Sequence, residues 1–328
     1  MAAKKISGLK NIAYELGVSI NTVSRALRDC DDISDSTKQK VREKAIELGY
    51  LPNNVSQFVK RDGKELIGIV TNSFDNPYYS IVFQKLVNIM TEYDYDFTVI
   101  FTTDNKLTVD VVKQCISQRV SGLITMLDVE NDAVQTLKLN DIPVVLVGRR
   151  CNNDYVDQVL TNDEEGGKLV ANYLVNYHKI RKCVYIKLAN AECSKRRQKS
   201  FENCINNYFP NEPVKVLTEA QARTQLIDLI NEGYTGIFCF CDQIAYRIIK
   251  QLNEYAPNFR KIYPRVHIIG YDCVSTRIPG MVDITSVDSD YDGVCQTTIE
   301  FITNKLLNNV KEQQVKVFHV FLHQRINL

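Results

Sequence analysis

Apolar residues in the first fifty positions recur three and four residues apart, with no strand-like alternation. The first such set predicts a helix that Gly17 ends. A second helix follows the natural N-cap Ser19, and a third runs from Ser34 to Gly49. The apolar positions that give these helices an inner face are Leu9, Ile12, Ala13, Leu16, Val23, Ala26, Leu27, Val41, Ala45, Ile46 and Leu48. We therefore expect a three-helix domain over residues 1–52.

The pattern changes after Pro52, which cannot continue a helix that precedes it. Residues 53–65 are largely polar and are expected to form a hinge and linker. From Leu66 onward, short apolar strands alternate with amphipathic helices, which predicts parallel sheets covered by helices. About ten strands exceed one comfortable open sheet, so residues 66–328 are expected to form two lobes of an α/β fold.

Composition places the chain among ordinary globular proteins, with 328 residues, 45% of them hydrophobic and 24% charged. The N-terminal residues do not form an apolar signal segment, and the ten cysteines lack the regular spacing of a small secreted scaffold. No apolar run approaches the roughly 20 residues of a membrane-spanning helix. We expect a cytoplasmic protein with reduced cysteines and no membrane partner.

Charge is unevenly distributed, although the net charge is only +1. Residues 1–28 contain five basic side chains against one acidic side chain, Glu15, which gives this segment a net charge of +4. Such a segment can neutralise phosphates and release counterions.

Several longer motifs make the pattern more specific. The helical part contains residues 11–27 (NIAYELGVSINTVSRAL), 33–38 (ISDSTK) and 48–53 (LGYLPN). The α/β part contains residues 76–79 (NPYY), 120–124 (VSGLI), 142–149 (IPVVLVGR), 162–167 (NDEEGG), 241–242 (CD) and 269–272 (IGYD). With these motifs the chain resembles the lactose-repressor (LacI/GalR) family of transcription regulators along nearly its whole length. The resemblance implies a helix-turn-helix headpiece followed by a two-lobed, periplasmic-binding-protein-like domain.

A helix-turn-helix places the start of its second helix in the major groove, where side chains meet base edges. Asn21 can then pair with adenine, Ile20 can touch a thymine methyl, and Arg25 can reach guanine or a phosphate. Backbone contacts are expected from Thr22, Ser24, Lys4 and Lys5. The alternative is an ordinary solvated helix face.

The resemblance also implies a hinge helix near residues 53–60 that folds on operator DNA and inserts an apolar wedge into the minor groove. Expected DNA contacts there are Asn53, Val55, Phe58 and Val59. Val59 stands where the family usually has leucine, and Ser56 where it usually has alanine, so whether the hinge kinks DNA stays open. A plain flexible linker is the alternative.

Ligands in open α/β folds bind beyond the carboxyl ends of strands, and the family pattern places an effector between two lobes. The implied N-lobe covers residues 66–177 and 290–317, and the C-lobe covers 178–289 and 318–328. The expected effector contacts are Phe74, Asn76, Tyr78, Tyr79, Arg149, Lys195, Arg197, Cys241, Asp242 and Asp272. Lys195 replaces an arginine and Cys241 replaces an asparagine of sugar-responsive relatives. The effector is therefore expected to be a sugar or related metabolite, but the sequence does not identify which one. Individual residues can instead serve packing.

Other function classes lack support in the sequence. The chain has no G-x-G-x-x-G after its first strand, no phosphate-binding loop and no nucleophile elbow, so we expect neither catalysis nor a cofactor. Its four histidines lack ligand spacing, so no metal site is expected. A regulator controlled by a protein co-repressor or by no effector remains open, as does a small-molecule-binding protein or enzyme on the same fold. We expect a homodimer on a near-palindromic operator.

Overall fold

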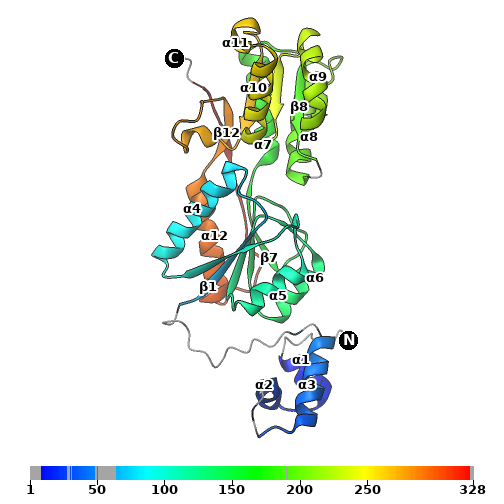
Figure 1. The fold of residues 1–328 in the computed structure, drawn as a ribbon, viewed down its shortest axis with the longest axis vertical. Helices are drawn as coiled ribbons and strands as arrows, with labels where there is room; N and C mark the ends of the chain where they lie inside the picture. Colours follow the sequence, from blue (N-terminus) through cyan, green and yellow to red (C-terminus); the bar gives the residue numbers. More distant parts are fainter. Residues whose placement is uncertain are drawn as a thin grey trace. The chain divides into compact units, whose positions relative to one another are not determined.

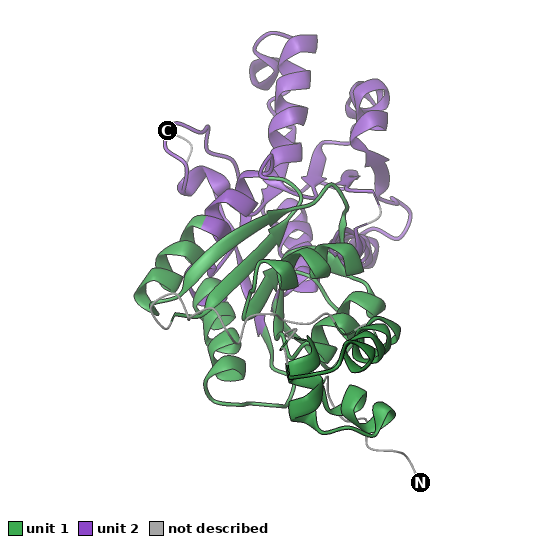
Figure 2. Cartoon of the chain, turned by 60° about the horizontal axis from the view of Figure 1, so that its bottom comes forward, with its two compact units in different colours: residues 1–73, 84–159, 295–316 green, residues 74–83, 160–294, 317–328 purple. Residues whose placement is uncertain are grey.

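The computed structural model describes residues 9–27, 30, 32–48, 50, 64–189 and 191–325. Two compact units make up the chain, and each contains segments that are far apart in the sequence (Figure 2). Unit 1 comprises residues 1–73, 84–159 and 295–316, and unit 2 comprises residues 74–83, 160–294 and 317–328. Among the described residues, none of the helices combines the length and apolarity that crossing a bilayer requires.

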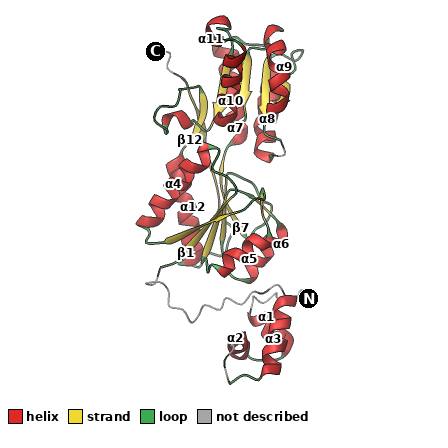
Figure 3. Ribbon diagram, in the orientation of Figure 1, coloured by secondary structure: helices red, strands yellow, loops and turns green. Residues whose placement is uncertain are grey.

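The headpiece contains the three predicted helices (Figure 3). They are α1 (Leu9–Leu16), α2 (Ile20–Leu27) and α3 (Asp35–Glu47). Their buried core consists of Ile12, Ala13, Val23, Ala26, Leu27, Val41 and Ala45. Seven apolar side chains from three helices thus supply a small core, as the helical spacing predicts, but Ile46, expected on the inner face of the third helix, is 76% exposed. Gly49, the expected end of the third helix, lies outside the described residues.

Local signals fix the ends of these helices. Gly17 adopts a φ of +64°, and the N–H of Val18 donates to Ala13 O at 3.0 Å, which closes α1 with a left-handed glycine. Ser19 Oγ accepts from the N–H of Thr22 at 3.0 Å. Ser34 Oγ accepts from the N–H of Thr37 at 3.3 Å. Both predicted N-caps are therefore confirmed.

Unit 1 is built on a six-stranded sheet in the order β13-β7-β6-β4-β1-β2. Its strands are β1 (Leu66–Thr71), β2 (Asp96–Phe101), β4 (Gly122–Thr125), β6 (Val144–Val147), β7 (Val156–Thr161) and β13 (Val315–Phe318). The short strands β3 (Lys106–Leu107) and β5 (Asp128–Val129) pair separately. Figure 1 shows α5 and α6 on one side of the sheet and α4 with α12 on the other. These helices are α4 (Pro77–Glu92), α5 (Val109–Ser117), α6 (Asn131–Leu139) and α12 (Tyr291–Leu306).

Late segments of the chain complete unit 1. A Cβ on Gly122 would lie 2.8 Å from Cγ1 of Ile302, so α12 packs closely on β4. The buried carboxylate of Asp157 accepts from the backbone N–H of Gln314 at 2.8 Å and pairs with Lys305 at 3.4 Å. Residues 295–316 are therefore integral to this unit.

Unit 2 contains a second six-stranded sheet in the order β14-β12-β11-β10-β8-β9. Its strands are β8 (Cys183–Lys187), β9 (Lys215–Thr218), β10 (Gly236–Cys239), β11 (His267–Tyr271), β12 (Ser286–Ser289) and β14 (Val320–His323). Only β14 among these described pairings runs antiparallel, against β12. The helices are α7 (Asp163–Asn172), the π-helix η1 (Tyr173–Tyr177), α8 (Glu192–Tyr208), α9 (Glu219–Asn231), α10 (Asp242–Tyr255), α11 (Phe259–Ile262) and the 3₁₀ turn η2 (Val274–Thr276).

The lobe boundaries expected near residues 177, 289 and 317 correspond to unit boundaries at 159/160, 294/295 and 316/317. The first differs because α7 packs on α8 of unit 2. A Cβ on Gly167 of α7 would lie only 2.6 Å from Arg197 O. Residues 74–83, expected in the N-lobe, also group with unit 2. Sequence alternation predicts that α7 covers a sheet but does not say which one.

Candidate DNA-binding helix and effector site

The N-terminal turn of α2 presents polar and apolar side chains to solvent. Ile20 is 44% exposed and Asn21 is also exposed. The Thr22 hydroxyl lies 2.8 Å from Ser19 Oγ, within the helix cap. On the other face, Val23 is fully buried against the headpiece core. The helix therefore has one face for folding and one available for contact with another molecule.

Arg25, one turn further along α2, forms an ion pair that the sequence does not predict. Its Nη2 lies 2.6 Å from Oδ2 of Asp32, and its Nε donates to Oδ1 at 3.3 Å. The hydrogen bond with Arg25 lowers the pKa of the Asp32 carboxyl. Ser24 is half-buried beside it. The other expected DNA contacts lie outside the described residues: Lys4, Lys5, Asn53, Val55, Phe58 and Val59.

In unit 2, the structure brings several of the expected effector residues together. Arg197 on α8 is 7% exposed, and its Nε donates to Oδ1 of Asp163 at 2.8 Å. Its Nη1 donates to Phe240 O at 2.8 Å, and its guanidinium carbon lies 3.4 Å from the ring centre of Tyr271. Arg197 is therefore a buried cation with a carboxylate and an aromatic face beside it.

Asp272 follows β11 in an unusual backbone conformation, with a φ of 101°. Its N–H donates to Val287 O at 2.8 Å, and the Tyr291 hydroxyl donates to Asp272 O at 2.6 Å. Burial raises the pKa of the Asp272 carboxyl, while the charge of Arg197 and a hydrogen bond from Asn76 oppose that rise. A non-glycine residue held at positive φ is typical of functional sites, where surrounding contacts offset the strain.

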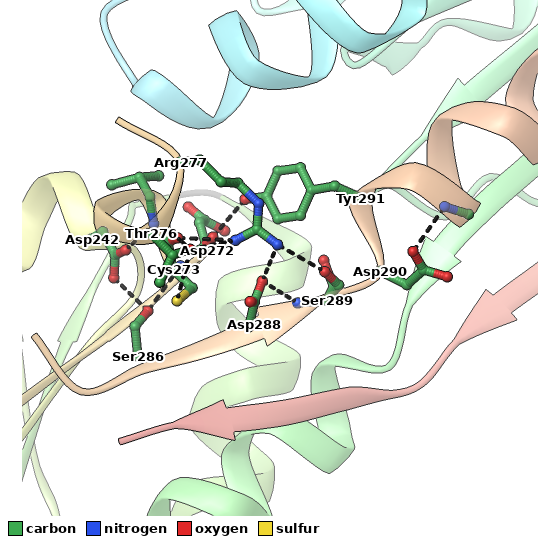
Figure 4. Close-up of polar contacts among 12 residues, drawn as sticks. Asp242, Asp272, Cys273, Thr276, Arg277, Ser286, Asp288, Ser289, Asp290 and Tyr291 are labelled. Carbon is green, nitrogen blue, oxygen red and sulfur yellow. Dashed lines mark hydrogen bonds and ion pairs between the residues drawn. The ribbon is translucent and has the colours of Figure 1, made fainter. Parts of the chain in front are cut away.

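Asp242, at the start of α10, holds the loop that carries Asp272. Its Oδ1 accepts from the Ser286 hydroxyl at 2.6 Å and its Oδ2 accepts from the Val274 N–H at 2.8 Å (Figure 4). Burial raises the pKa of this carboxyl to about 7. Cys241, the residue before it, is also buried, which raises the pKa of its thiol. Both residues are buried, and Asp242 holds the backbone after β11 through the Val274 N–H.

Three further residues join this region without having been expected from the sequence. Arg277 pairs with Asp288 at 2.9 Å, and its guanidinium carbon lies 4.0 Å from the ring centre of Tyr291 (Figure 4). Tyr291 in turn contacts Tyr78 edge to face, with ring centres 5.6 Å apart. Asp288 and Tyr291 lie at and just beyond the carboxyl end of β12, so the strand-end rule could have found them. We call Asn76, Arg197, Asp272 and Tyr291 the Asp272 cluster.

The remaining expected effector residues have other surroundings. Phe74 contacts Phe83 with ring centres 5.3 Å apart, and Tyr79 contacts Tyr78 at 5.4 Å. Lys195 is 65% exposed and pairs with Glu192, so Arg197 and not Lys195 is the buried cation of α8. Arg149 belongs to unit 1, where it pairs with Asp128 at 2.9 Å and donates to Met126 O.

Comparison with known proteins identifies both parts of the chain. The profile of the periplasmic binding protein domain matches residues 67–299, and that of the lacI family of bacterial regulatory proteins matches residues 8–53. The transcriptional repressor PurR of Aliivibrio fischeri is 25% identical over 321 residues, which cover 94% of each chain.

Solved structures share the fold. The complex of the transcriptional regulator CelR with cellobiose has a TM-score of 0.65 at 17% identity and covers 97% of this chain and 98% of that one. The lac repressor dimer bound to operator and the anti-inducer ONPF has a TM-score of 0.63 at 19% identity, with 98% of each chain covered. The predicted α/β architecture and the family resemblance are thereby confirmed. The chain belongs to the lacI family of bacterial regulatory proteins and is a DNA-binding transcription regulator.

Proposed function

We propose that the protein represses transcription as a cytoplasmic homodimer whose two headpieces bind the half-sites of a near-palindromic operator. A small uncharged metabolite bound at the Asp272 cluster controls that binding. The observation that carries the DNA-binding part is the start of α2, where the Ser19 cap leaves Ile20 and Asn21 exposed above a buried inner face. This arrangement suits insertion of the helix start into a major groove.

Selection of duplexes from random DNA by the full chain tests this function. We expect enrichment of one near-palindromic sequence. Arg25→Ala should weaken binding to it by about 1 to 3 kcal/mol and relax preference at one base pair per half-site. Lys4→Ala, which removes a phosphate contact, should weaken binding to all sequences alike and reduce the salt dependence. Failure of the wild-type chain to enrich any sequence would contradict the function.

The chemistry of the Asp272 cluster supports an uncharged ligand. Arg197 already pairs with the buried carboxylate of Asp163, which it shares with Arg196, and Asp272 interacts with the same cation, so an anionic ligand would approach two carboxyl groups there. The carboxyl oxygens of Asp272 can accept from ligand hydroxyl or N–H groups, and the ring of Tyr291 lies beside its backbone. Structures of the same fold contain cellobiose and, in a regulator from Enterococcus faecium, ribose. A sugar or related polyol therefore fits the proposal best.

Calorimetric titration of the full chain with sugars, sugar phosphates, nucleosides and amino acids tests the effector. We expect one uncharged class to bind and Asp272→Asn to weaken that binding by about tenfold or more, because the amide places a donor where the ligand needs an acceptor. Asp228→Asn, the same change at an exposed position on α9, is the matched control. A blank with every class would instead favour a protein co-repressor.

A further inference from the structure

The ion pair between Arg25 and Asp32 joins the proposed recognition helix to the connection that precedes α3. Its two side chains are 41% and 53% exposed. Pairs as exposed as this contribute little to stability, because water screens the charges and ordering two side chains costs entropy. The fold therefore does not depend on this pair.

The geometry of the pair determines how Arg25 can meet DNA. Asp32 contacts Nε and Nη2, which form the side edge of the planar guanidinium. The other edge, made of Nη1 and the second N–H of Nη2, points away from the carboxylate. That edge can donate two parallel hydrogen bonds to O6 and N7 of guanine. A phosphate, in contrast, accepts hydrogen bonds from an arginine in many orientations, so it does not require the guanidinium plane to be fixed.

Asp32 also has an electrostatic effect on DNA binding. The hydrogen bond with Arg25 lowers the pKa of its carboxyl, and Lys38 adds a weaker effect in the same direction. Asp32 is therefore ionised at neutral pH and repels phosphates of every sequence alike. A carboxylate at this position lowers the affinity of the headpiece for DNA of any sequence. Such a loss is useful only if the carboxylate also improves discrimination between sequences.

We propose that Asp32 is a positioning residue that makes Arg25 a reader of guanine and prevents it from acting as a mobile phosphate contact. This inference rests on the proposed function, since it assigns a specificity determinant to the same headpiece. By holding the side edge of the guanidinium, Asp32 fixes the plane of the opposite edge before DNA arrives. The ordering of the arginine side chain is then already complete when guanine is bound.

The test uses the full chain with Asp32→Asn and the duplex that wild-type protein selects from random DNA, together with its single-base-pair variants. We expect discrimination at the base pair read by Arg25 to fall about tenfold, within the range of one bidentate contact. Affinity for random duplex should rise, because one negative charge is lost. Discrimination at the other base pairs should not change.

Asp35→Asn is the matched control, because Asp35 is an exposed aspartate that pairs with Lys38 at 3.7 Å. It removes the same charge and should raise affinity for all duplexes without changing discrimination. In the Arg25→Ala background, Asp32→Asn should have no further effect on discrimination. If Asp32→Asn behaves like Asp35→Asn while Arg25→Ala relaxes specificity, the positioning role is wrong and the proposed function stands. If the wild-type chain selects no sequence, both fail.

Discussion

At the scale of single residues, Asp242 shows how a buried acid can hold a loop in place. Its carboxyl binds Ser286 and Val274 and so fixes the loop after β11. Asp242→Ala should lower the free energy of unfolding by about 1 to 3 kcal/mol, because it leaves a buried N–H and hydroxyl without their acceptor. Chemical denaturation of the full chain would measure this, with Asp228→Ala on the surface expected to have little effect.

The same residue predicts a pH dependence. Its pKa is raised from 3.8 to about 7, so the folded protein holds a proton that the unfolded chain releases between these values. The stability that this proton contributes is present below pH 3.8 and is lost as pH rises through about 7.

Asp242→Asn cannot ionise, so the wild type should lose stability relative to this variant as pH rises from 5 to 8. The pKa of His267 is lowered to about 4, which acts with the opposite sign, so the readout is the difference between the two denaturation series. If the free energies of unfolding of the two proteins changed with pH in parallel, the raised pKa of Asp242 would be contradicted.

Which site residues the sequence could predict depended on how local their signals are. Ser19 as a cap and Asp272 beyond a strand were predictable, because each follows from its neighbours in the chain. Asp32 beside Arg25 and Asp288 beside Arg277 were not, because tertiary structure chooses the partner of an arginine. Asp242 and Cys241 follow a strand end, as expected, but the pattern could not predict that both are buried.

At the scale of elements, the contact between α7 and α8 controls the position of Arg197. A Cβ on Gly167 would lie 2.6 Å from Arg197 O and 2.9 Å from the backbone N of Phe201. Backbone atoms cannot rotate aside, so Gly167→Ala should displace α8 and cost about 1 to 3 kcal/mol of stability. Lys168→Ala, at an exposed position of the same helix, should cost little. Equal melting temperatures for the two variants would contradict this close packing.

Elements with a strong hydrophobic period were predictable, and those that depend on pairing partners were not. The three headpiece helices and most of the parallel strands follow from spacing alone. The π-helix η1 and the antiparallel strand β14 do not, because each depends on contacts made by the folded chain. The same reason explains why the first lobe boundary, expected near residue 177, differs from the unit boundary at 159/160.

At the scale of the whole molecule, strand β2 supports the proposed homodimer. It lies at the edge of the first sheet, and its alternate residues Phe97, Val99 and Phe101 are 41%, 37% and 55% exposed. Alternation puts these three apolar side chains on one side of the strand, where a second copy of the chain can cover them.

Phe101→Glu should therefore convert dimers to monomers in sedimentation velocity and weaken binding to the two-half-site operator. Tyr177→Glu places the same charge on an exposed aromatic residue of unit 2 and should leave the dimer intact. A dimer that survives Phe101→Glu would contradict the use of this strand.

The late return of the chain into unit 1 has a consequence for biosynthesis. Asp157 is buried against Gln314 and Lys305, and Gly122 faces Ile302. A ribosome synthesises these partners after all of unit 2's central strands, so most strands of the first sheet emerge long before helix α12 and strand β13. Until then the sheet of the nascent chain is incomplete. Premature termination before residue 295 would release a product in which the apolar face that α12 covers is exposed to solvent.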